Sequence, residues 1–325
     1  MTLLIADSLE ADVLDWLRER HAVREAPELA NDQRALRRAL YNVRAMIVPA
    51  SVTLDAQTLH HAPVLRAVGR ISAGAESIDL EACARARIEV VRSPAASATA
   101  EAEFAVGAML SMLRRVPVSG SDGLPVGREL GAATIGLIGM PPAARSVAQM
   151  LAGFGSRVIG YDPALHASDG LWSRWRVAPV GLRELIESAD AVCVLLSYFS
   201  RFRGLLGERF LPTCKPNQVL VCLSYSGLFD ETCLADALRS GRIAAAWLDS
   251  LEPGALEPGR PLHGIPTLQV TPRVASITRE SRQRTAWAVA RRIDDILNLD
   301  ASVAREFRAT APSGTADLGA GPWLP

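Results

Sequence analysis

Short apolar runs alternate with helical patterns of apolar and polar positions from the first residues of the chain onward. In the N-terminal part this pattern predicts strands at 3–6, 45–48, 64–71 and 88–91, and helices at 9–20 and 79–86. Such alternation is typical of βαβ units, which build open parallel sheets. The first hundred residues therefore predict one compact open-sheet domain.

A long apolar helix, predicted at 101–115, follows this domain and is ended by Pro117 and the Gly/Ser-rich stretch 119–123. A second alternating series then begins at Thr134 and indicates a Rossmann-type domain. Its strands are predicted at 134–138, 157–161, 191–196, 218–223, 244–248 and 267–271, with a closing helix at 278–299 that returns to the first domain. The fold class is thus α/β with two open parallel-sheet domains.

Composition narrows the range of partners. The chain has 325 residues, a length that suits two domains, and its 35 basic residues balance 35 acidic ones. A zero net charge gives no electrostatic reason to expect nucleic acid or an anionic membrane as partner. No apolar run approaches the roughly 20 residues that span a bilayer, and the N-terminus lacks the basic run of a signal peptide. A small-molecule site or a protein partner is expected.

The five cysteines contain no Cys-x-x-Cys pair, which argues against a disulfide framework and against a structural metal site. Reduced thiols in the cytoplasm are the simplest account, so a cytoplasmic protein without a metal is expected. These cysteines are Cys83, Cys193, Cys214, Cys222 and Cys233.

One segment between a predicted strand and helix stands where a Gly-x-Gly-x-x-Gly phosphate loop belongs, and its glycine slots hold Gly139, Pro141 and Ala144. Alanine is tolerated at the third slot, after Ala143, but a pyrrolidine ring at the second slot fills the space through which the backbone approaches a diphosphate. Pro142 removes a further N–H from the helix start, although proline is also favourable there. The loop predicts a cofactor site in which NAD binding is weakened or lost.

Asp162 ends the second strand of this series, 23 positions after Gly139. An acid at this offset accepts hydrogen bonds from the adenosine ribose and disfavours a 2′-phosphate, which favours NAD over NADP. The alternative is a turn aspartate before Pro163.

Several segments are similar to the D-isomer-specific 2-hydroxyacid dehydrogenase family, over a span from near Leu3 to about Ala286. They are 68–80, 227–231, 235–249, Glu252-Pro253, Pro261-Leu262 and Val270-Thr271-Pro272. The resemblance implies a flavodoxin-like substrate domain built from both chain ends around a central NAD domain, and a homodimer formed through the NAD domains. The expected bounds are 1–100 plus 278–308 for the first, 101–277 for the second, and a disordered tail at 309–325.

The family transfers a hydride between nicotinamide and C2 of a 2-oxo or 2-hydroxy acid, using an arginine, a glutamate and a histidine. The matching slots hold Tyr225, Gly254 and Arg273, so all three side chains are changed. Glu252 matches a neighbouring family acid rather than the catalytic one. Family features that remain are the substrate-binding backbone at Ala73 and Gly74 and an acid near the nicotinamide, Asp249.

The altered slots limit the chemistry. Proton transfer at neutral pH needs a group whose pKa lies near 7, and arginine stays protonated to above about pH 12. Arg273 therefore does not replace a histidine, whereas Tyr225 is a weak acid with an ordinary pKa near 10. No histidine occupies the catalytic slot, and His263 lies in the loop closest in sequence to it. The family reaction by the family mechanism is not expected.

Three hypotheses remain. The favoured one is a degenerate relative that acts as a binding, regulatory or scaffolding pseudoenzyme for an unknown small anionic ligand or protein partner. In the second, a repurposed enzyme, Arg273 holds a carboxylate or phosphonate and Tyr225 donates a proton or binds an oxyanion. The third is a weak NAD-dependent 2-hydroxyacid oxidoreductase. Bulky side chains at Tyr225 and Arg273 could also simply fill the pocket.

Overall fold

A computed structural model describes residues 2–72, 77–115, 118–119 and 125–310. The chain divides into two compact units, which are described separately: unit 1 comprises 1–70, 75–91 and 289–325, and unit 2 comprises 71–74 and 92–288. The predicted boundaries at 100 and 278 differ because all of α5 (Pro94–Arg115) and the start of α10 (Arg279–Thr310) belong to unit 2. The tail predicted to be disordered, 309–325, begins with two helical residues at the end of α10, so the prediction is wrong there; from 311 on it lies outside the described residues.

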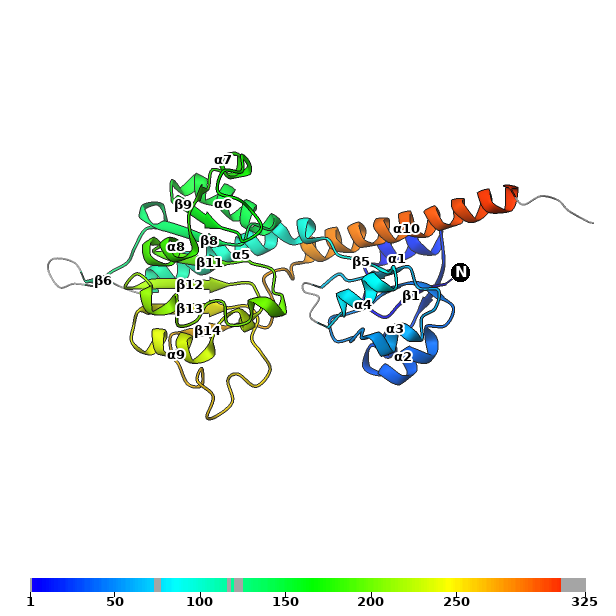
Figure 1. The fold of residues 1–325 in the computed structure, drawn as a ribbon, viewed down its shortest axis with the longest axis horizontal. Coiled ribbons are helices and arrows are strands. Elements are labelled where there is room, and N and C mark those ends of the chain that lie inside the picture. The colour runs from blue at the N-terminus through cyan, green and yellow to red at the C-terminus, as the bar shows by residue number, and fades with distance from the viewer. Residues whose placement is uncertain (1, 73–76, 116–117, 120–124, 311–325) are drawn as a thin grey trace, which may run out of the picture. The chain divides into compact units, whose positions relative to one another are not determined.

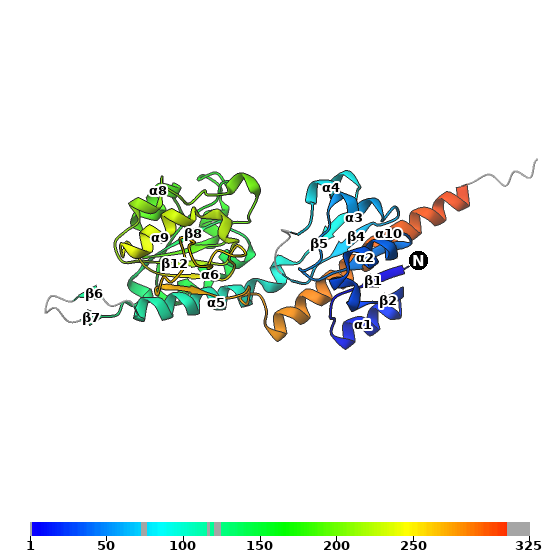
Figure 2. The same ribbon diagram turned by 90° about the horizontal axis from the view of Figure 1, so that it is seen from below.

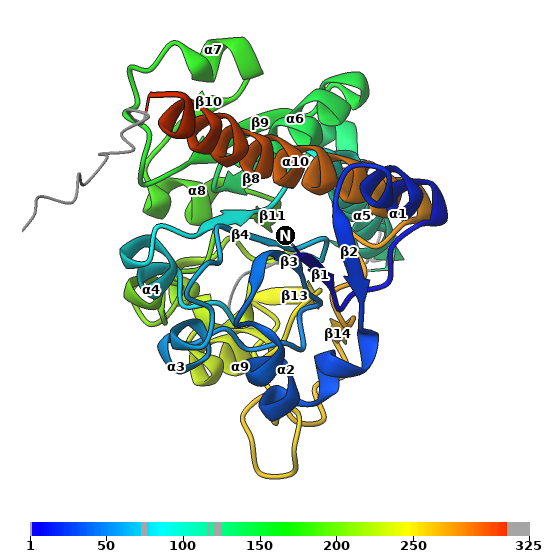
Figure 3. The ribbon, with the colours of Figure 1, turned by 90° about the vertical axis from the view of Figure 1, so that its right-hand side faces the viewer.

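Unit 1 contains a five-stranded parallel sheet with the order β2-β1-β3-β4-β5 (Figures 1 and 3). This is the flavodoxin-like order, in which the chain starts near the middle of the sheet and winds outward in both directions. The flavodoxin-like prediction is therefore confirmed. The strands are β1 (Thr2–Ile5), β2 (Ala22–Glu25), β3 (Val43–Ile47), β4 (Ala67–Gly69) and β5 (Glu89–Val91).

Helices cover both faces of this sheet, with α1 and α10 on one face and α2, α3 and α4 on the other (Figures 1 and 3). Aspartates fix where three of them begin, because Asp32, Asp55 and Asp79 each accept a hydrogen bond from a first-turn N–H group. The helices are α1 (Ala11–Arg18), α2 (Gln33–Ala39), α3 (Ala56–His60) and α4 (Leu80–Arg85).

The middle of α10 packs directly on the sheet of unit 1. A Cβ added to Gly69 in β4 would lie 2.6 Å from Val289 Cγ1 and 2.8 Å from Ile293 Cδ1, so a glycine is required for this close approach. The His21 ring bonds Asp294 at 2.8 Å. Both ends of the described chain thus contribute to unit 1.

Unit 2 contains a seven-stranded parallel sheet in the order β10-β9-β8-β11-β12-β13-β14 (Figure 1). The chain starts in the interior at β8, moves outward to β10, and then returns to build the other half from β11. This doubly wound order confirms the Rossmann-type prediction. The strands are β8 (Thr134–Ile138), β9 (Arg157–Tyr161), β10 (Ala178–Pro179), β11 (Ala191–Val194), β12 (Gln218–Cys222), β13 (Ile243–Leu248) and β14 (Leu268–Val270).

Two helices cover each face of this sheet: α5 and α6 lie on one, α8 and α9 on the other (Figure 2). The sheet is buried on both faces, which explains why its strands are continuous apolar runs. A short hairpin of β6 (Val118–Ser119) and β7 (Pro125–Val126) lies apart from it. The helices are α6 (Pro142–Phe154), α7 (Leu171–Trp175), α8 (Leu182–Ser188) and α9 (Glu231–Arg239), with 3-10 turns at Pro27–Asn31, Leu130–Ala132, Ser200–Phe202, Leu211–Thr213 and Ser226–Leu228.

Candidate functional site

The carboxyl ends of the unit 2 strands meet at one edge of the sheet, because all these strands are parallel. At the point where the winding reverses, β8 and β11 are neighbours. A Cβ added to Gly139, after β8, would lie 2.5 Å from the Cα of Leu196, after β11, so the two loops touch there. Open α/β sheets bind ligands at such a switch point.

The phosphate loop has a well-formed turn and helix start. Gly139 has a φ of +88°, a left-handed conformation that favours glycine. Helix α6 begins at Pro142 with Pro141 as its N-cap, which confirms the helix-start interpretation of Pro142. Ala143 and Ala144 are buried, as expected for the small side chain at the third slot.

The helix start nevertheless offers few hydrogen-bond donors to a phosphate. Anions at a helix N-terminus bind its first backbone N–H groups. Pro141 and Pro142 have none, so Ala143 and Ala144 supply the N–H groups of this turn. The donor set fits a diphosphate, with fewer bonds than a glycine-rich loop supplies.

Asp162 follows β9 and is tied into the same loop. Its Oδ2 accepts a hydrogen bond from the N–H of Met140 at 2.8 Å, and its Oδ1 accepts one from the N–H of Ala164 at 2.8 Å. The turn interpretation is therefore correct. The same carboxylate can also accept hydrogen bonds from ribose hydroxyls, because each of its oxygens has a second lone pair.

Arg145, which was not predicted from the sequence, lies beside this loop. Its guanidinium stacks on the ring of Trp175, with Cζ 4.6 Å from the centroid, and its Nε donates to the carbonyl of Met140 at 3.3 Å. The stacking holds a positive charge beside the start of α6, which favours an anion there.

Further along the same edge, side chains from four loops form a group that we call the tyrosine cluster. The rings of Tyr198 and Tyr225 pack edge to face, with centroids 5.1 Å apart. Arg203 Nη1 forms an ion pair with Glu252 Oε1 at 2.5 Å. The Cζ of Arg273 lies 5.8 Å from the centre of the Tyr225 ring. The structure therefore brings two of the three altered family slots, Tyr225 and Arg273, together.

Gly227 makes this packing possible. A Cβ at this position would lie 3.1 Å from both Glu252 Oε1 and Tyr198 Cε2 and 3.2 Å from Tyr225 Cδ1. Its carbonyl accepts a hydrogen bond from the N–H of Gly204 at 2.9 Å, which fixes the loop that carries Arg203. A glycine is needed because three side chains converge on one face of its backbone.

The surroundings of Tyr225 keep its phenol protonated. Burial raises the pKa of Tyr225, the charge of Glu252 and the neighbouring Tyr198 raise it further, and Arg203 and Arg273 oppose these effects in part. At neutral pH the phenol is therefore a hydrogen-bond donor. It can donate to a carbonyl or carboxylate oxygen placed against it.

Asp249 is buried at the end of β13 and organises the turn that carries Arg273. Its carboxylate accepts hydrogen bonds from Thr271 Oγ1 at 2.6 Å and from the N–H groups of Val274 and Ala275, both at 2.9 Å. Within this turn Arg273 has a φ of +58°, and its Nε donates to Ser250 Oγ at 3.0 Å. Asp249 thus holds the altered histidine slot in place.

Glu101, on α5, is a second acidic group that was not predicted from the sequence. Burial raises its pKa, and the charge of Asp249 adds to the rise, while a hydrogen bond from Ser97 Oγ to its Oε1, 2.6 Å long, opposes it. A serine followed four residues later by a glutamate, on a helix rich in apolar residues, was the available sign in the sequence.

The glutamate slot has no side chain, but an acid from a nearby position reaches the site. Gly254 has a φ of +78°, so its turn favours glycine. Glu252, predicted only as a neighbouring acid, joins the tyrosine cluster instead. His263 bonds the carbonyl of Leu256 at 2.8 Å and stabilises its own loop. Ala73 and Gly74 lie outside the described residues.

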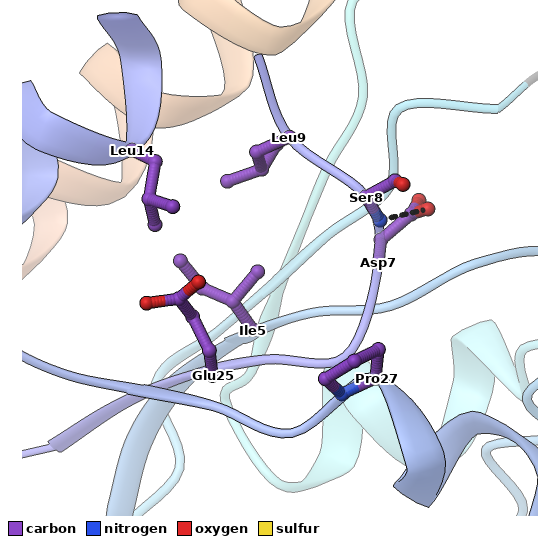
Figure 4. Close-up of a pocket in the computed structure, with 7 residues that line it drawn as sticks. All are labelled: Ile5, Asp7, Ser8, Leu9, Leu14, Glu25 and Pro27. Atoms are coloured by element: carbon purple, nitrogen blue, oxygen red, sulfur yellow. Dashed lines mark hydrogen bonds between the residues drawn. The ribbon is translucent and has the colours of Figure 1, made fainter. Parts of the chain in front are cut away.

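Cavities open in both units, within the described part of the chain. One of about 540 Å³ lies in unit 2 between the loop 251–257 and the turn 270–272, with Glu252 on its wall. The other, of about 190 Å³, lies in unit 1 beside the ends of β1 and β2 (Figure 4). Its wall combines apolar and acidic side chains: Ile5, Asp7, Ser8, Leu9, Leu14, Glu25 and Pro27. The first cavity adjoins the candidate site through Glu252.

Within the described ranges no three His, Cys, Asp or Glu side chains are grouped so that they could hold a metal ion. No described helix combines the length and the apolar character needed to cross a membrane.

Comparison with known proteins defines the class. Residues 109–275 match the family model of the D-isomer specific 2-hydroxyacid dehydrogenase, NAD binding domain. The chain belongs to this family, and the switch-point loops and the tyrosine cluster lie within its NAD-binding domain.

Individual relatives are enzymes of this family. The chain is 32% identical to an (S)-sulfolactate dehydrogenase from Chromohalobacter salexigens, over 86% of this chain and 92% of the relative. It is 30% identical to a D-3-phosphoglycerate dehydrogenase from Mycobacterium bovis, over 89% of this chain but only 55% of that longer protein. Among solved structures, the TT0316 protein from Thermus thermophilus matches with a TM-score of 0.72 and 27% identity, over 89% of this chain and 94% of that one.

Proposed function

We propose that this chain is a repurposed oxidoreductase that uses NAD(H) on a small anionic 2-oxo or 2-hydroxy acid. Tyr225 and Arg273, at the positions of the family's catalytic arginine and histidine, are its proposed catalytic residues. The observation that carries the proposal is the convergence of Tyr225, Arg273, Arg203 and Glu252 at the carboxyl edge of the NAD-binding domain. A merely filled pocket does not need two guanidinium groups beside a protonated phenol.

Each residue has a distinct part in this mechanism. Arg273, oriented by Ser250 and by the turn built on Asp249, attracts the carboxylate of the acid. Tyr225 donates its proton to the carbonyl oxygen at C2 as that carbon is reduced, and regains a proton from water. NAD(H), when bound, supplies or accepts the hydride. Losing the histidine still costs roughly 10²–10⁴ in rate, so slow turnover is expected.

Cofactor binding is expected to be weaker than in a relative with an intact glycine-rich loop. Three features still favour binding of the cofactor. Asp162 is placed to accept hydrogen bonds from the adenosine ribose, Gly139 allows the tight turn of the phosphate loop, and Arg145 adds a positive charge beside the start of α6. Pro141 and Pro142 each remove a donor from the diphosphate site. Because Asp162 disfavours a 2′-phosphate, NAD rather than NADP is the proposed cofactor.

The experiment is a two-step test on purified protein. First, NADH fluorescence is titrated with the wild-type chain and with Pro141→Gly. The variant should bind about tenfold more tightly, since one charge-assisted hydrogen bond is restored; Pro258→Gly, in an exposed loop, controls for backbone freedom. Unchanged affinity in Pro141→Gly would show that the proline does not limit binding.

Second, NADH oxidation is measured with 2-oxo acids that carry a second anionic group, because two relatives are named for sulfolactate and 3-phosphoglycerate. Tyr225→Phe and Arg273→Ala should each lower kcat/KM by at least tenfold while leaving NADH affinity unchanged. Absence of turnover with every acid tested, despite NADH binding, would reject the oxidoreductase.

A non-catalytic binding module is the second candidate. It is favoured by the tight packing of Tyr198, Tyr225 and Glu252 around Gly227, which leaves little free space within the cluster. It predicts anion or protein binding with no NADH oxidation. Its ligand or partner is unassigned. We also propose, from the family resemblance, a homodimer formed through unit 2; light scattering at micromolar concentration tests it.

A further inference from the structure

The side chain of Arg145 folds back from the first turn of α6 onto the loop that precedes this helix. Its Nε donates to the carbonyl of Met140 at 3.3 Å. The N–H of Met140 donates in turn to Asp162 Oδ2 at 2.8 Å. Met140 is therefore held through both of its backbone groups, by an arginine at the carbonyl and by an aspartate at the N–H. These bonds place the guanidinium at the phosphate loop.

Two tryptophans of α7 hold this guanidinium in one orientation. The Cζ of Arg145 lies 4.6 Å from the centroid of the Trp175 ring. The Trp175 ring packs edge to face on that of Trp172, with centroids 6.0 Å apart. Trp172 is buried, and its Nε1 donates to the carbonyl of His166 at 2.9 Å. A guanidinium stacked on a fixed ring loses little freedom when it binds a ligand, which favours affinity.

The two Nη groups of Arg145 remain available for a ligand. Among the residues that the structure describes, Arg145 has no acidic partner, and its side chain forms the single hydrogen bond to Met140. Asp162 does not pair with it, because its two oxygens accept from the N–H groups of Met140 and Ala164. A guanidinium with free Nη groups binds phosphoryl oxygens in a fork, through charge-assisted hydrogen bonds.

The same loop lacks backbone donors. Pro141 and Pro142 have no N–H group, whereas a glycine-rich loop binds phosphate mainly through its backbone amides. A side chain with unused donors thus stands beside a loop from which two backbone donors are missing. The anion receptor at this position is a guanidinium on an aromatic platform rather than the start of a helix.

We propose that Arg145, supported by Trp175, binds the 5′-phosphoryl group of an adenine nucleotide, so that a side chain replaces the backbone as the phosphate receptor. Asp162 accepts hydrogen bonds from the ribose of the same nucleotide. The recognised unit is adenosine with a 5′-phosphoryl group, which a dinucleotide and ADP both carry. Such a receptor binds ADP without any contribution from a nicotinamide.

The test compares ADP with adenosine, which lacks the phosphoryl groups. Both are titrated against the full chain at low ionic strength and followed by NMR of the ligand signals, with no dinucleotide present. The wild type should bind ADP at least about tenfold more tightly than adenosine. Arg145→Ala should reduce this preference to about twofold or less while leaving the affinity for adenosine unchanged. Trp175→Leu keeps the charge but removes the stacking, so it should lose part of the preference.

Arg174→Ala is the matched control. Arg174 precedes Trp175 on α7 and is exposed, and in the described part of the chain its side chain has no hydrogen bond or ion pair. The substitution removes the same charge from the neighbouring surface, so the preference for ADP should persist. Equal loss in Arg145→Ala and Arg174→Ala would reduce the effect to general electrostatics and overturn the proposal, as would a wild-type chain without a preference for ADP.

This inference rests on the cofactor position of the proposed function but not on its chemistry. ADP binding that depends on Arg145, in a chain that does not bind NADH, would uphold the phosphoryl site and reject the NAD(H)-dependent oxidoreductase. Oxidation of NADH by 2-oxo acids, with ADP and NADH affinities that are independent of Arg145, would do the reverse. Displacement of NADH by ADP, with both affinities lowered in Arg145→Ala, would show that one receptor serves both nucleotides and would uphold the site.

Discussion

Asp249 accepts three hydrogen bonds from the turn 271–275, one from a hydroxyl and two from backbone N–H groups. Asp249 thus positions its neighbours, whereas Tyr225 is acted on by its own: burial and the charges around it determine its protonation state. Both residues were identified from the sequence, but their roles come from partners that are distant along the chain. At the scale of single residues, the site is defined by which polar atoms face each other.

Asp249→Asn is expected to destabilise unit 2 by about 1–3 kcal/mol, because an amide NH₂ then faces donors that need an acceptor. Urea unfolding followed by circular dichroism measures the change. Asp236→Asn, an exposed acid on α9, should alter stability by less than about 0.5 kcal/mol. Equal stability of Asp249→Asn and the wild type would mean that the turn is held by other contacts.

Tyr225 should ionise above its ordinary pKa, near 10, because burial and Glu252 raise the pKa in the folded state. A group whose pKa is raised by folding contributes stability that is fully present below the unfolded pKa and lost as pH rises through the folded pKa. The wild type should therefore lose stability relative to Tyr225→Phe above about pH 10. Difference absorbance of phenolate between the two proteins locates the ionisation; a transition below pH 10 would contradict the assigned surroundings.

At the scale of elements, glycines decide how closely strands, loops and helices approach. Gly139 lies against the backbone of Leu196, and Gly227 lies against three side chains of the tyrosine cluster. Gly153, inside α6, is different, because a Cβ added there would have no neighbouring atom within 4 Å. Packing therefore requires a glycine at positions 139 and 227, but not at position 153.

Gly139→Ala should destabilise the protein by more than about 2 kcal/mol and abolish NADH binding, since a positive φ and a 2.5 Å contact with Leu196 Cα are both unfavourable. Gly153→Ala should instead stabilise it by about 0.5–1 kcal/mol through helix propensity. Thermal unfolding measures both. A Gly139→Ala protein that keeps the wild-type melting temperature and NADH affinity would rule out the tight turn.

At the scale of the whole molecule, two units with separate cores share one chain. One buried cluster of unit 1 is built from residues 4–88, and Val289 and Ile293 of α10 are buried on its sheet as well, whereas the two cores that flank the unit 2 sheet are built from residues 98–265. Helix α10 contributes to both units, because its first residues belong to unit 2 and the rest to unit 1. Damage to one core should therefore remain largely within its own unit.

Gly69→Val should destabilise unit 1 by about 1–3 kcal/mol, since its side chain meets Val289 and Ile293 of α10. Hydrogen exchange should show lost protection in β1, β3 and β4 with β8 and α6 unchanged. Gly136→Val is the mirror control, because a Cβ there would lie 2.6 Å from Leu185 in unit 2. Loss of protection in both units from either change would show a single cooperative core.

The sequence by itself determined the two parallel-sheet units, most strand positions, the helix start at Pro142 and the family. These features depend on local periodicity and on short motifs, which the chain carries whatever its tertiary contacts. Only the tertiary structure decided that Glu252 and Arg203 join Tyr225 and Arg273, that Asp249 holds a turn, and that Glu101 is a half-buried acid with a raised pKa. Those residues lie on separate loops and helices, and their proximity follows from strand order and side-chain packing, which no local pattern encodes.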